Sequence, residues 1–389
     1  MGAVSREHAP VRARARALVL LACWWPLAAG AGEPGRKAPP PPRAMLLADA
    51  TSGRALREHN ADEPLPVGAL GQLMLALLVL ERVDSGQLGW EQPLPVSAAA
   101  AAQAGARLAL REAEVLTLEE ALRAMVIAGA TDAAAVLSEA LADSPAPLVA
   151  LMNERARVLG MIGTEYGSLA GSARARSQPV DVTTARDTSR LVAELLRRRR
   201  IVEWGALSGI PFRGGSVLLR NRNQLLESLP GTNGLLVADL PRGGGFHLVA
   251  TARRGVFQLL AVVLGAADNG SRYAATAELL EWGFATFERI DIVRAAEPLP
   301  VPVRIWGGAE EQLVPVAAGG YSLLRRRDEE RRFELGFQLP DGLTAPIARD
   351  QRIGEVVVRE NDQVVAVIPA VSPVEVSADD GAAFKPLTQ

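Results

Sequence analysis

The hydrophobic pattern of this 389-residue chain changes its period near residue 292, and this change constrains the fold more than any other feature. Before it, apolar residues recur at helical spacing in long segments and also form runs that are typical of buried strands. After it, short segments alternate between apolar and polar residues. The pattern therefore predicts a domain of mixed helices and strands over 44–292, followed by a small all-β domain over 293–377.

Individual elements can be assigned in both parts. Arg253-Arg254-Gly255 lies between two apolar runs and is a hairpin signal. The other segments are assigned from their period alone. The first part contains predicted strands 44–49, 246–252 and 256–264 and predicted helices 69–83, 118–141 and 272–288, and the second contains predicted strands 301–306, 334–339, 355–358 and 364–368.

The first 31 residues have the features of a signal peptide. Three arginines precede the apolar segment 17–27, and the small residues Ala29-Gly30-Ala31 match a signal-peptidase site. We therefore expect export to the periplasm or cell envelope, with cleavage near Ala31. Two alternatives stay open: a retained membrane anchor, which the short apolar segment disfavours, and a lipoprotein modified at Cys23.

Two further segments have no means of packing into a core. Residues 32–43 form a proline-rich linker, and residues 378–389 form a polar, flexible tail. The tail shows no amphipathic periodicity, so we expect no C-terminal amphipathic membrane anchor.

The composition excludes several classes of function. The net charge is −2, which gives no basic surface for nucleic acid. One cysteine and three histidines cannot supply a disulfide framework or a Cys/His metal site, and no cofactor is implied. Of the 42 basic residues only Lys37 and Lys385 are lysines. A guanidinium does not release its proton at working pH, so no lysine-type general base is available between them.

Several short motifs occur in an order that resembles one family. They are Ala48–Gly53 with Asn60–Glu63, Met152–Met161, Thr184–Asp187, Asn221–Asn223, Gly231–Gly234, Trp306–Gly308 and Ala345–Ile347. The chain is similar in these motifs to the penicillin-binding D-alanyl-D-alanine carboxypeptidases, serine peptidases that trim peptidoglycan stem peptides. The resemblance implies an α+β, penicillin-binding/β-lactamase-like domain, with an antiparallel sheet flanked by helices, before the all-β domain.

The resemblance also implies three catalytic elements. The family uses a serine with a lysine three residues later on the same helical face, a Ser-x-Asn element, and a Lys-Thr-Gly strand. The first element falls on Ala69 and Gln72, the second on Gly129 and Thr131, and the third at about Leu236. A methyl group cannot form an acyl-enzyme and an amide has no useful basicity, so none of the three elements is intact.

Three other side chains have both a functional and an ordinary interpretation. Arg222 matches an arginine that in the family lies near the substrate carboxylate, but it could equally form an ion pair that holds a loop. Thr131 could donate a hydrogen bond to a ligand or cap a helix. His247 is interpreted as a packed or edge-strand histidine.

These observations leave three hypotheses. The first is a catalytically inactive envelope protein that uses the inherited cleft or the β domain to bind peptidoglycan stem peptides or a cell-wall enzyme. The second is an active serine-type D-Ala-D-Ala carboxypeptidase with a rearranged mechanism. The third is a structural partner that docks through the C-terminal β domain. The sequence specifies neither a partner nor an oligomeric state.

Overall fold

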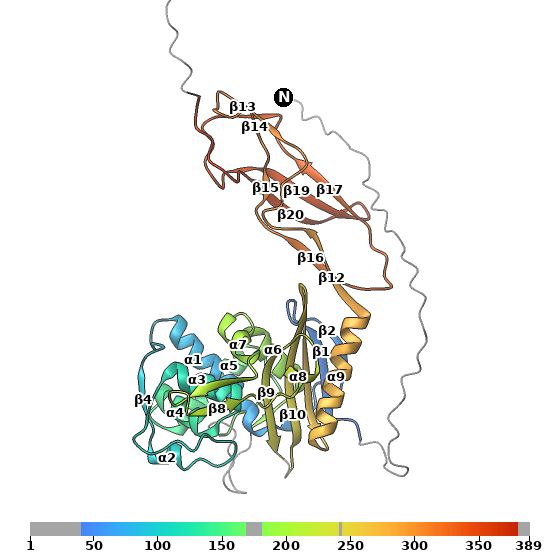
Figure 1. Cartoon of the computed structure of the whole chain (residues 1–389). Helices are drawn as coiled ribbons and strands as arrows, with labels where there is room; N and C mark the ends of the chain where they lie inside the picture. Colours follow the sequence, from blue (N-terminus) through green and yellow to red (C-terminus); the bar gives the residue numbers. More distant parts are fainter. Residues whose placement is uncertain (1–39, 169–180, 241–242, 380–389) are drawn as a thin grey trace, which may run out of the picture. The chain divides into compact units, whose positions relative to one another are not determined.

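The computed structural model describes residues 40–168, 181–240 and 243–379 (Figure 1). The predicted signal peptide, Cys23, most of the proline-rich linker and the tail from residue 380 lie outside the described residues. The described chain divides into two compact units, 40–287 and 288–379. The boundary that the sequence pattern placed near residue 292 falls inside strand β12, Phe287–Val293.

A five-stranded antiparallel sheet forms the centre of the first unit. Its strand order is β2-β1-β11-β10-β9. Figure 1 shows α9, Asn269–Thr286, on one side of this sheet and most of the other helices on the opposite side. The inner strands are almost continuously apolar because helices cover both faces. The strands are β1 (Ala44–Asp49), β2 (Ala55–His59), β9 (Thr232–Leu240), β10 (Gly245–Arg254) and β11 (Phe257–Ala266).

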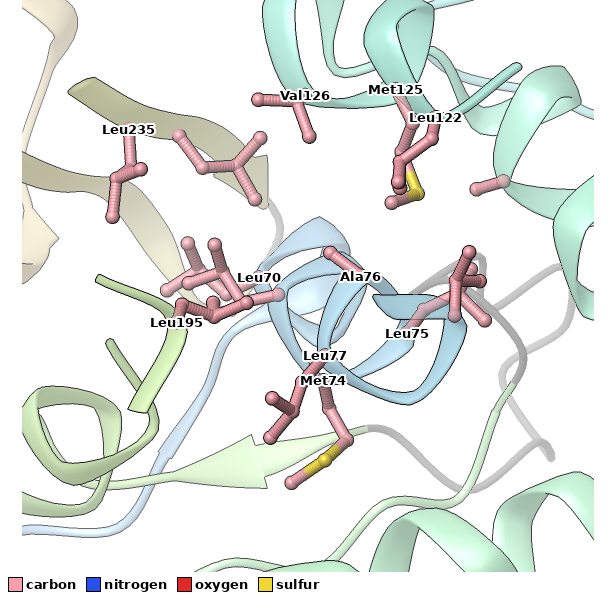
Figure 2. Close-up of a cluster of buried hydrophobic side chains, with 14 of the residues drawn as sticks. Leu70, Met74, Leu75, Ala76, Leu77, Leu122, Met125, Val126, Leu195 and Leu235 are labelled. Atoms are coloured by element: carbon pink, nitrogen blue, oxygen red, sulfur yellow. The ribbon is translucent and has the colours of Figure 1, made fainter. Parts of the chain in front are cut away.

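Helix α1, Gln72–Asp84, runs through the core of this unit. Its first nine residues are all buried, and all of them except Gln72 are apolar, as is expected of a helix inside a core. Figure 2 shows leucine and methionine side chains from α1 and from neighbouring elements packed around it. The remaining helices are η1 (Gly68–Gly71), α2 (Ala98–Ala101), α3 (Leu118–Ala128), α4 (Thr131–Leu141), α5 (Pro145–Val158), α6 (Ala185–Leu195), α7 (Arg199–Gly205) and α8 (Leu225–Ser228).

The single helix predicted over 118–141 is wrong, because the structure has two helices there. The side chain of Thr117 accepts a hydrogen bond from Glu120 N, and this capping box begins α3. Gly129 ends α3 in the left-handed conformation, with φ of 64°. Helix α4 then begins at Thr131 with a new direction.

Short strand pairs complete the first unit. Strand β3 (Leu65–Pro66) pairs with β6 (Val182–Thr183) and leads directly into η1. The other two pairs are β4 (Pro93–Pro95) with β5 (Val115–Thr117), and β7 (Gly209–Phe212) with β8 (Val217–Arg220).

The second unit is built from strands, as its alternating pattern predicts. Two clusters of buried residues form its core, one around Val356 and Ile368 and one around Ile305 and Ile347. Its strands form three sheets, with the orders β12-β16, β14-β13-β18 and β15-β20-β19-β17. Besides β12, the strands are β13 (Val303–Trp306), β14 (Gln312–Leu313), β15 (Val316–Ala317), β16 (Tyr321–Arg326), β17 (Phe333–Gln338), β18 (Gly342–Thr344), β19 (Arg352–Glu360) and β20 (Gln363–Val371).

Within the described ranges, no single helix is long and apolar enough to cross a membrane. Helices α4 and α5 pass that test only when taken together, and they meet at 90°.

Candidate active site

The first motif positions lie where η1 joins α1. Ala69 is half-buried in η1, and Gln72 is the first residue of α1, only 1% exposed. The amide nitrogen Nε2 of Gln72 donates a long hydrogen bond of 3.5 Å to the carbonyl oxygen of Gly129. Its other amide atom, Oε1, is buried and has no hydrogen-bond partner among the described residues. The first motif therefore contacts the second through an amide that is only half satisfied.

The second motif positions lie at the junction of α3 and α4. Gly129 has no side chain to offer, and a Cβ there would lie 3.4 Å from Nη1 of Arg222. The hydroxyl of Thr131 shares its single proton between the carbonyl oxygens of Ala104, at 2.8 Å, and Ala106, at 2.9 Å. Ala130, not Thr131, is the N-cap of α4. The Thr131 hydroxyl thus holds the preceding loop and does not cap the helix.

Asp132 anchors the same loop from within α4. Its fully buried carboxylate accepts hydrogen bonds from the backbone nitrogens of Leu108 and Leu110, at 2.9 and 3.1 Å. No local signal in the sequence pointed to this role, because Asp132 lies in the interior of the helical segment predicted over 118–141 and becomes a first-turn residue only where the structure begins α4 at Thr131.

The third motif position lies on β9 and faces the first across a small void. Gln72 and Leu236 both line this void, together with apolar side chains that include Met125 and Leu235. Figure 2 labels Met125 and Leu235 within the surrounding hydrophobic cluster. Its volume is about 10 Å³. A water molecule needs roughly 10–15 Å³ and two or more polar partners. The space between these motif positions is therefore almost filled and has room for one water molecule at most.

Arg222 lies beside Gly129 and is already paired. Its Nη2 donates to Oδ2 of Asp239 at the end of β9, and its Nη1 donates to the carbonyl oxygen of Val237 at 3.4 Å. Arg272 of α9 donates to the other oxygen of the same carboxylate. Its side chain is only 4% exposed. Of the two interpretations of Arg222, the structure places it in an ion pair.

The two arginines determine the ionisation of Asp239. Burial alone would raise the pKa of this carboxyl, but the hydrogen bond and charge of Arg272, together with Arg222, hold the pKa below its usual range. Neither Asp239 nor Arg272 was singled out from the sequence. Their pairing joins β9 to α9 and depends on tertiary register, for which a single sequence carries no local signal.

His247 is packed in the inner strand β10, which agrees with the packed alternative of its two predicted placements. It is fully buried, and its Nδ1 accepts a hydrogen bond from Gly265 N at 3.1 Å. Burial, and then the positive charge of Arg272, lowers the pKa of His247 to about 4. The imidazole is therefore neutral at physiological pH.

The three motif positions thus converge between α1, the α3–α4 junction and β9, on one edge of an antiparallel sheet that helices flank. An all-β unit follows this domain. This architecture defines the class of low-molecular-mass penicillin-binding proteins.

Comparisons with known proteins lead to the same class. A family model described as D-alanyl-D-alanine carboxypeptidase matches residues 40–268, and a model of the C-terminal domain of penicillin-binding protein 5 matches residues 287–378. The chain belongs to the D-alanyl-D-alanine carboxypeptidase family. The resemblance and the fold class predicted from the sequence are both confirmed.

Individual relatives are distant but cover most of the chain. D-alanyl-D-alanine carboxypeptidase DacF of Bacillus subtilis is 23% identical over 334 residues, 85% of this chain and 84% of the relative. D-alanyl-D-alanine carboxypeptidase DacC of Escherichia coli is 26% identical over 336 residues, which cover 85% of this chain and 82% of the relative.

Solved structures share the fold. Penicillin binding protein 5 from Haemophilus influenzae has a TM-score of 0.63 at 21% identity, and the match covers 88% of this chain and all of that one. A peptidoglycan synthesis regulatory factor from Streptococcus pneumoniae has a TM-score of 0.68 at 19% identity, and the match covers 86% and 99% of the two chains.

Proposed function

We propose that the chain is a non-catalytic member of its family that is exported to the bacterial cell envelope and binds peptidoglycan there. The observation that carries this proposal is the nearly filled, mainly apolar void between Gln72 and Leu236. In this family these two positions would belong to the proton-accepting lysine and to the Lys-Thr-Gly strand. Here they hold a buried amide and an apolar side chain.

Acyl transfer needs a nucleophile, a base within hydrogen-bond reach and donors for the developing oxyanion. Ala69 offers a methyl group, Gly129 offers no side chain, and the Thr131 hydroxyl is used by two loop carbonyls. No lysine lies between Lys37 and Lys385 to serve as a substitute base. Removal of a single member of such a set costs several orders of magnitude in rate, so the joint change supports an inactive protein.

Asp239 also argues against binding of a peptide carboxylate in the cleft. A substrate carboxylate at Arg222 would have to displace an internal carboxylate that two arginines already hold. The intramolecular partner loses no translational freedom on pairing, so a free peptide competes poorly with it. We therefore assign peptidoglycan binding to a surface outside the cleft.

A fluorescent penicillin tests the catalytic part of the proposal. The purified chain should show no covalent label and release no D-alanine from a D-Ala-D-Ala peptide, whereas the Escherichia coli relative DacC serves as the positive control. The variant Ala69→Ser should stay unlabelled as well, because Gln72 cannot accept the proton of the restored hydroxyl. Labelling of the unmodified chain would overturn the proposal.

A pull-down on purified peptidoglycan tests the binding part. The full chain should sediment with the polymer, and Arg222→Ala should sediment equally well because the cleft is not the binding surface. A chain that stays in the supernatant would contradict peptidoglycan binding.

Docking of a protein partner is the second candidate function. It is favoured by Val364, Val365 and Val367, which are exposed on β20 of the second unit. The double variant Val365→Glu/Val367→Glu should then abolish envelope localisation in cells without changing peptidoglycan sedimentation, and unchanged localisation would exclude this function.

A further inference from the structure

The second unit presents one tryptophan flat on its surface. Trp306 is the last residue of β13 and is 51% exposed, although its neighbours Val303 and Ile305 are buried on the opposite face of the sheet. An indole ring is among the most costly side chains to leave in water. Its exposure therefore needs an explanation beyond the packing of this unit.

The ring rests face-on against Gly342 of β18. A Cβ at Gly342 would lie 2.7, 2.8 and 2.9 Å from Cη2, Cζ2 and Cζ3 of the indole. Near-equal distances to three consecutive ring atoms place that point over the face of the six-membered ring, since an edge-on approach would leave the outer two atoms much farther away. One face of the indole thus packs on backbone that lacks a side chain, and the exposed half is the opposite face.

Polar side chains surround this aromatic platform. Parallel pairing sets Thr344 beside Trp306 and Gly342 beside Arg304, and antiparallel pairing sets Gln312 beside Arg304. Register partners share a face of the sheet, so all these side chains lie on the same side as the indole. Arg304, Gln312 and Thr344 are exposed, and no carboxylate in the described part of the chain pairs with Arg304.

The composition of the rim selects the class of ligand. Glu310, Glu311 and Asp341 are exposed close to the platform along the chain, which disfavours a polyanion. A single exposed ring among amide, hydroxyl and guanidinium groups is too polar for a lipid surface. A pyranose ring fits both properties, because its C–H face can stack on the negative face of the indole while its hydroxyls bond to the rim.

We propose that Trp306, on its Gly342 support, is a sugar-binding platform that takes a neutral pyranose ring of a glycan strand, with Arg304, Gln312 and Thr344 as hydrogen-bonding partners. This inference rests on the proposed function, since it names the part of peptidoglycan that the second unit contacts.

Titration with a tetrasaccharide of β-1,4-linked N-acetylglucosamine tests the platform, with calorimetry and intrinsic tryptophan fluorescence as readouts. The full chain should bind, and Trp306→Ala should weaken binding at least tenfold. Trp306→Phe should lie between the two, because the smaller ring keeps part of the stacking area. Trp90→Ala, at a half-buried indole in the first unit, should bind as the unmodified chain does.

Gly342→Ala provides a matched variant that keeps the indole. The added methyl group would lie within 2.9 Å of the ring and must move it, so binding should fall nearly as far as with Trp306→Ala while the far-ultraviolet circular dichroism stays unchanged. Absence of tetrasaccharide binding by the full chain at millimolar concentration, or equal binding by Trp306→Ala, would overturn the platform.

Sedimentation with whole peptidoglycan separates this inference from the function on which it rests. If the full chain sediments and Trp306→Ala sediments equally well, the platform is wrong but peptidoglycan binding stands. If the full chain does not sediment, peptidoglycan binding itself is wrong.

Discussion

Gln72 is a buried polar residue that lowers stability. It occupies the position at which the family resemblance would place a lysine. It is almost fully buried, yet its Oε1 has no partner among the described residues and its Nε2 makes only one long hydrogen bond. An unsatisfied buried polar group costs roughly 1–3 kcal/mol. Packing alone would favour an apolar side chain of similar volume at this position.

Replacement of Gln72 by leucine should therefore stabilise the protein. Leucine matches the apolar lining of the adjoining void and leaves no unpaired oxygen, so we expect the free energy of unfolding to rise by about 1 kcal/mol. Urea denaturation of the full chain measures this. Gln224→Leu, at an exposed position, should change stability by less than about 0.5 kcal/mol. A clear loss of stability in Gln72→Leu would show that the amide is better satisfied than the structure indicates.

Asp239 is the second residue whose role can be measured. Asp239→Asn leaves the buried Arg272 without a carboxylate, so we expect a loss of about 2–3 kcal/mol, near the lower end for a broken buried pair. Glu281→Gln breaks the exposed pair with Arg254 and should cost less than about 1 kcal/mol. Since the folded-state pKa of Asp239 is lowered, its contribution is present at neutral pH and is lost in acid, below about pH 4. Equal losses in the two variants would contradict the assignment.

Asp181 and His247 should make stability depend on pH with opposite signs. Burial raises the pKa of Asp181 from 3.8 to about 6, so the folded state holds a proton that the unfolded state has released, and stability falls as pH rises through this range. Burial lowers the pKa of His247 from 6.5 to about 4, so the unfolded state holds the extra proton, and stability rises with pH. Between about pH 4 and 6 the two contributions nearly cancel.

The variant Asp181→Asn should leave the contribution of His247 as the main source of pH dependence in stability between about pH 4 and 6.5. It keeps Oδ1 as the acceptor for Gly167 N and Ser168 N, and stability should then rise from pH 4 to 6.5 by at most about 1.4 kcal/mol per pH unit. Chemical denaturation at a series of pH values measures the slope. Asp143→Asn, at an exposed position, should keep the flat profile of the unmodified chain, and a flat profile in Asp181→Asn would contradict the opposing pair.

At the scale of elements, the α3–α4 junction shows how a local conformation shapes the site. Gly129 adopts a φ of 64°, which is costly for any residue with a Cβ, and its carbonyl oxygen accepts the only hydrogen bond that the Gln72 side chain donates among the described residues.

Replacement of Gly129 by alanine should cost about 1–2 kcal/mol from backbone conformation alone. Gly86→Ala is a matched control, because Gly86 has a φ of 73° and no atom within 4 Å of its missing Cβ. The contact with Arg222, 3.4 Å, is ordinary, so the two variants should lose similar stability in thermal unfolding. A neutral Gly129→Ala would contradict the left-handed assignment.

The sequence predicted those elements that have a strong period and clear boundaries. Strand 44–49 and the hairpin around Gly255 are confirmed because their apolar runs end at turn residues. The helix predicted over 118–141 was wrong because an alanine-rich segment keeps its helical period through Gly129, although the backbone turns there. Motif spacing located Gln72, Gly129 and Leu236, which the structure brings together. It could not locate Asp239 or Arg272, since their pairing depends on how β9 and α9 pack.

At the scale of the whole molecule, lysine is nearly absent, and arginine has not taken its place at the catalytic motif positions. Arginine serves well in structural ion pairs: Arg186, for example, binds both Glu58 and Asp62 with paired hydrogen bonds. A bias that only exchanged lysine for arginine would leave arginine at the motif positions. Gln72 and Leu236 occur there instead, which is consistent with loss of the need for the chemistry itself.

In this account the two units have different roles. The first keeps the family fold around a filled cleft, and the second presents Trp306 and the exposed face of β20. Binding in this account depends on the second unit and is independent of the cleft.

Exposure of the purified full chain to a fluorescent penicillin, followed by denaturing electrophoresis, tests the central claim most directly. The account predicts no covalent band under conditions that label the Escherichia coli relative fully, because no nucleophile with a proton acceptor lies at Ala69 and Gln72. A stoichiometric band that unlabelled penicillin abolishes would contradict it and would identify the chain as an active member of its family.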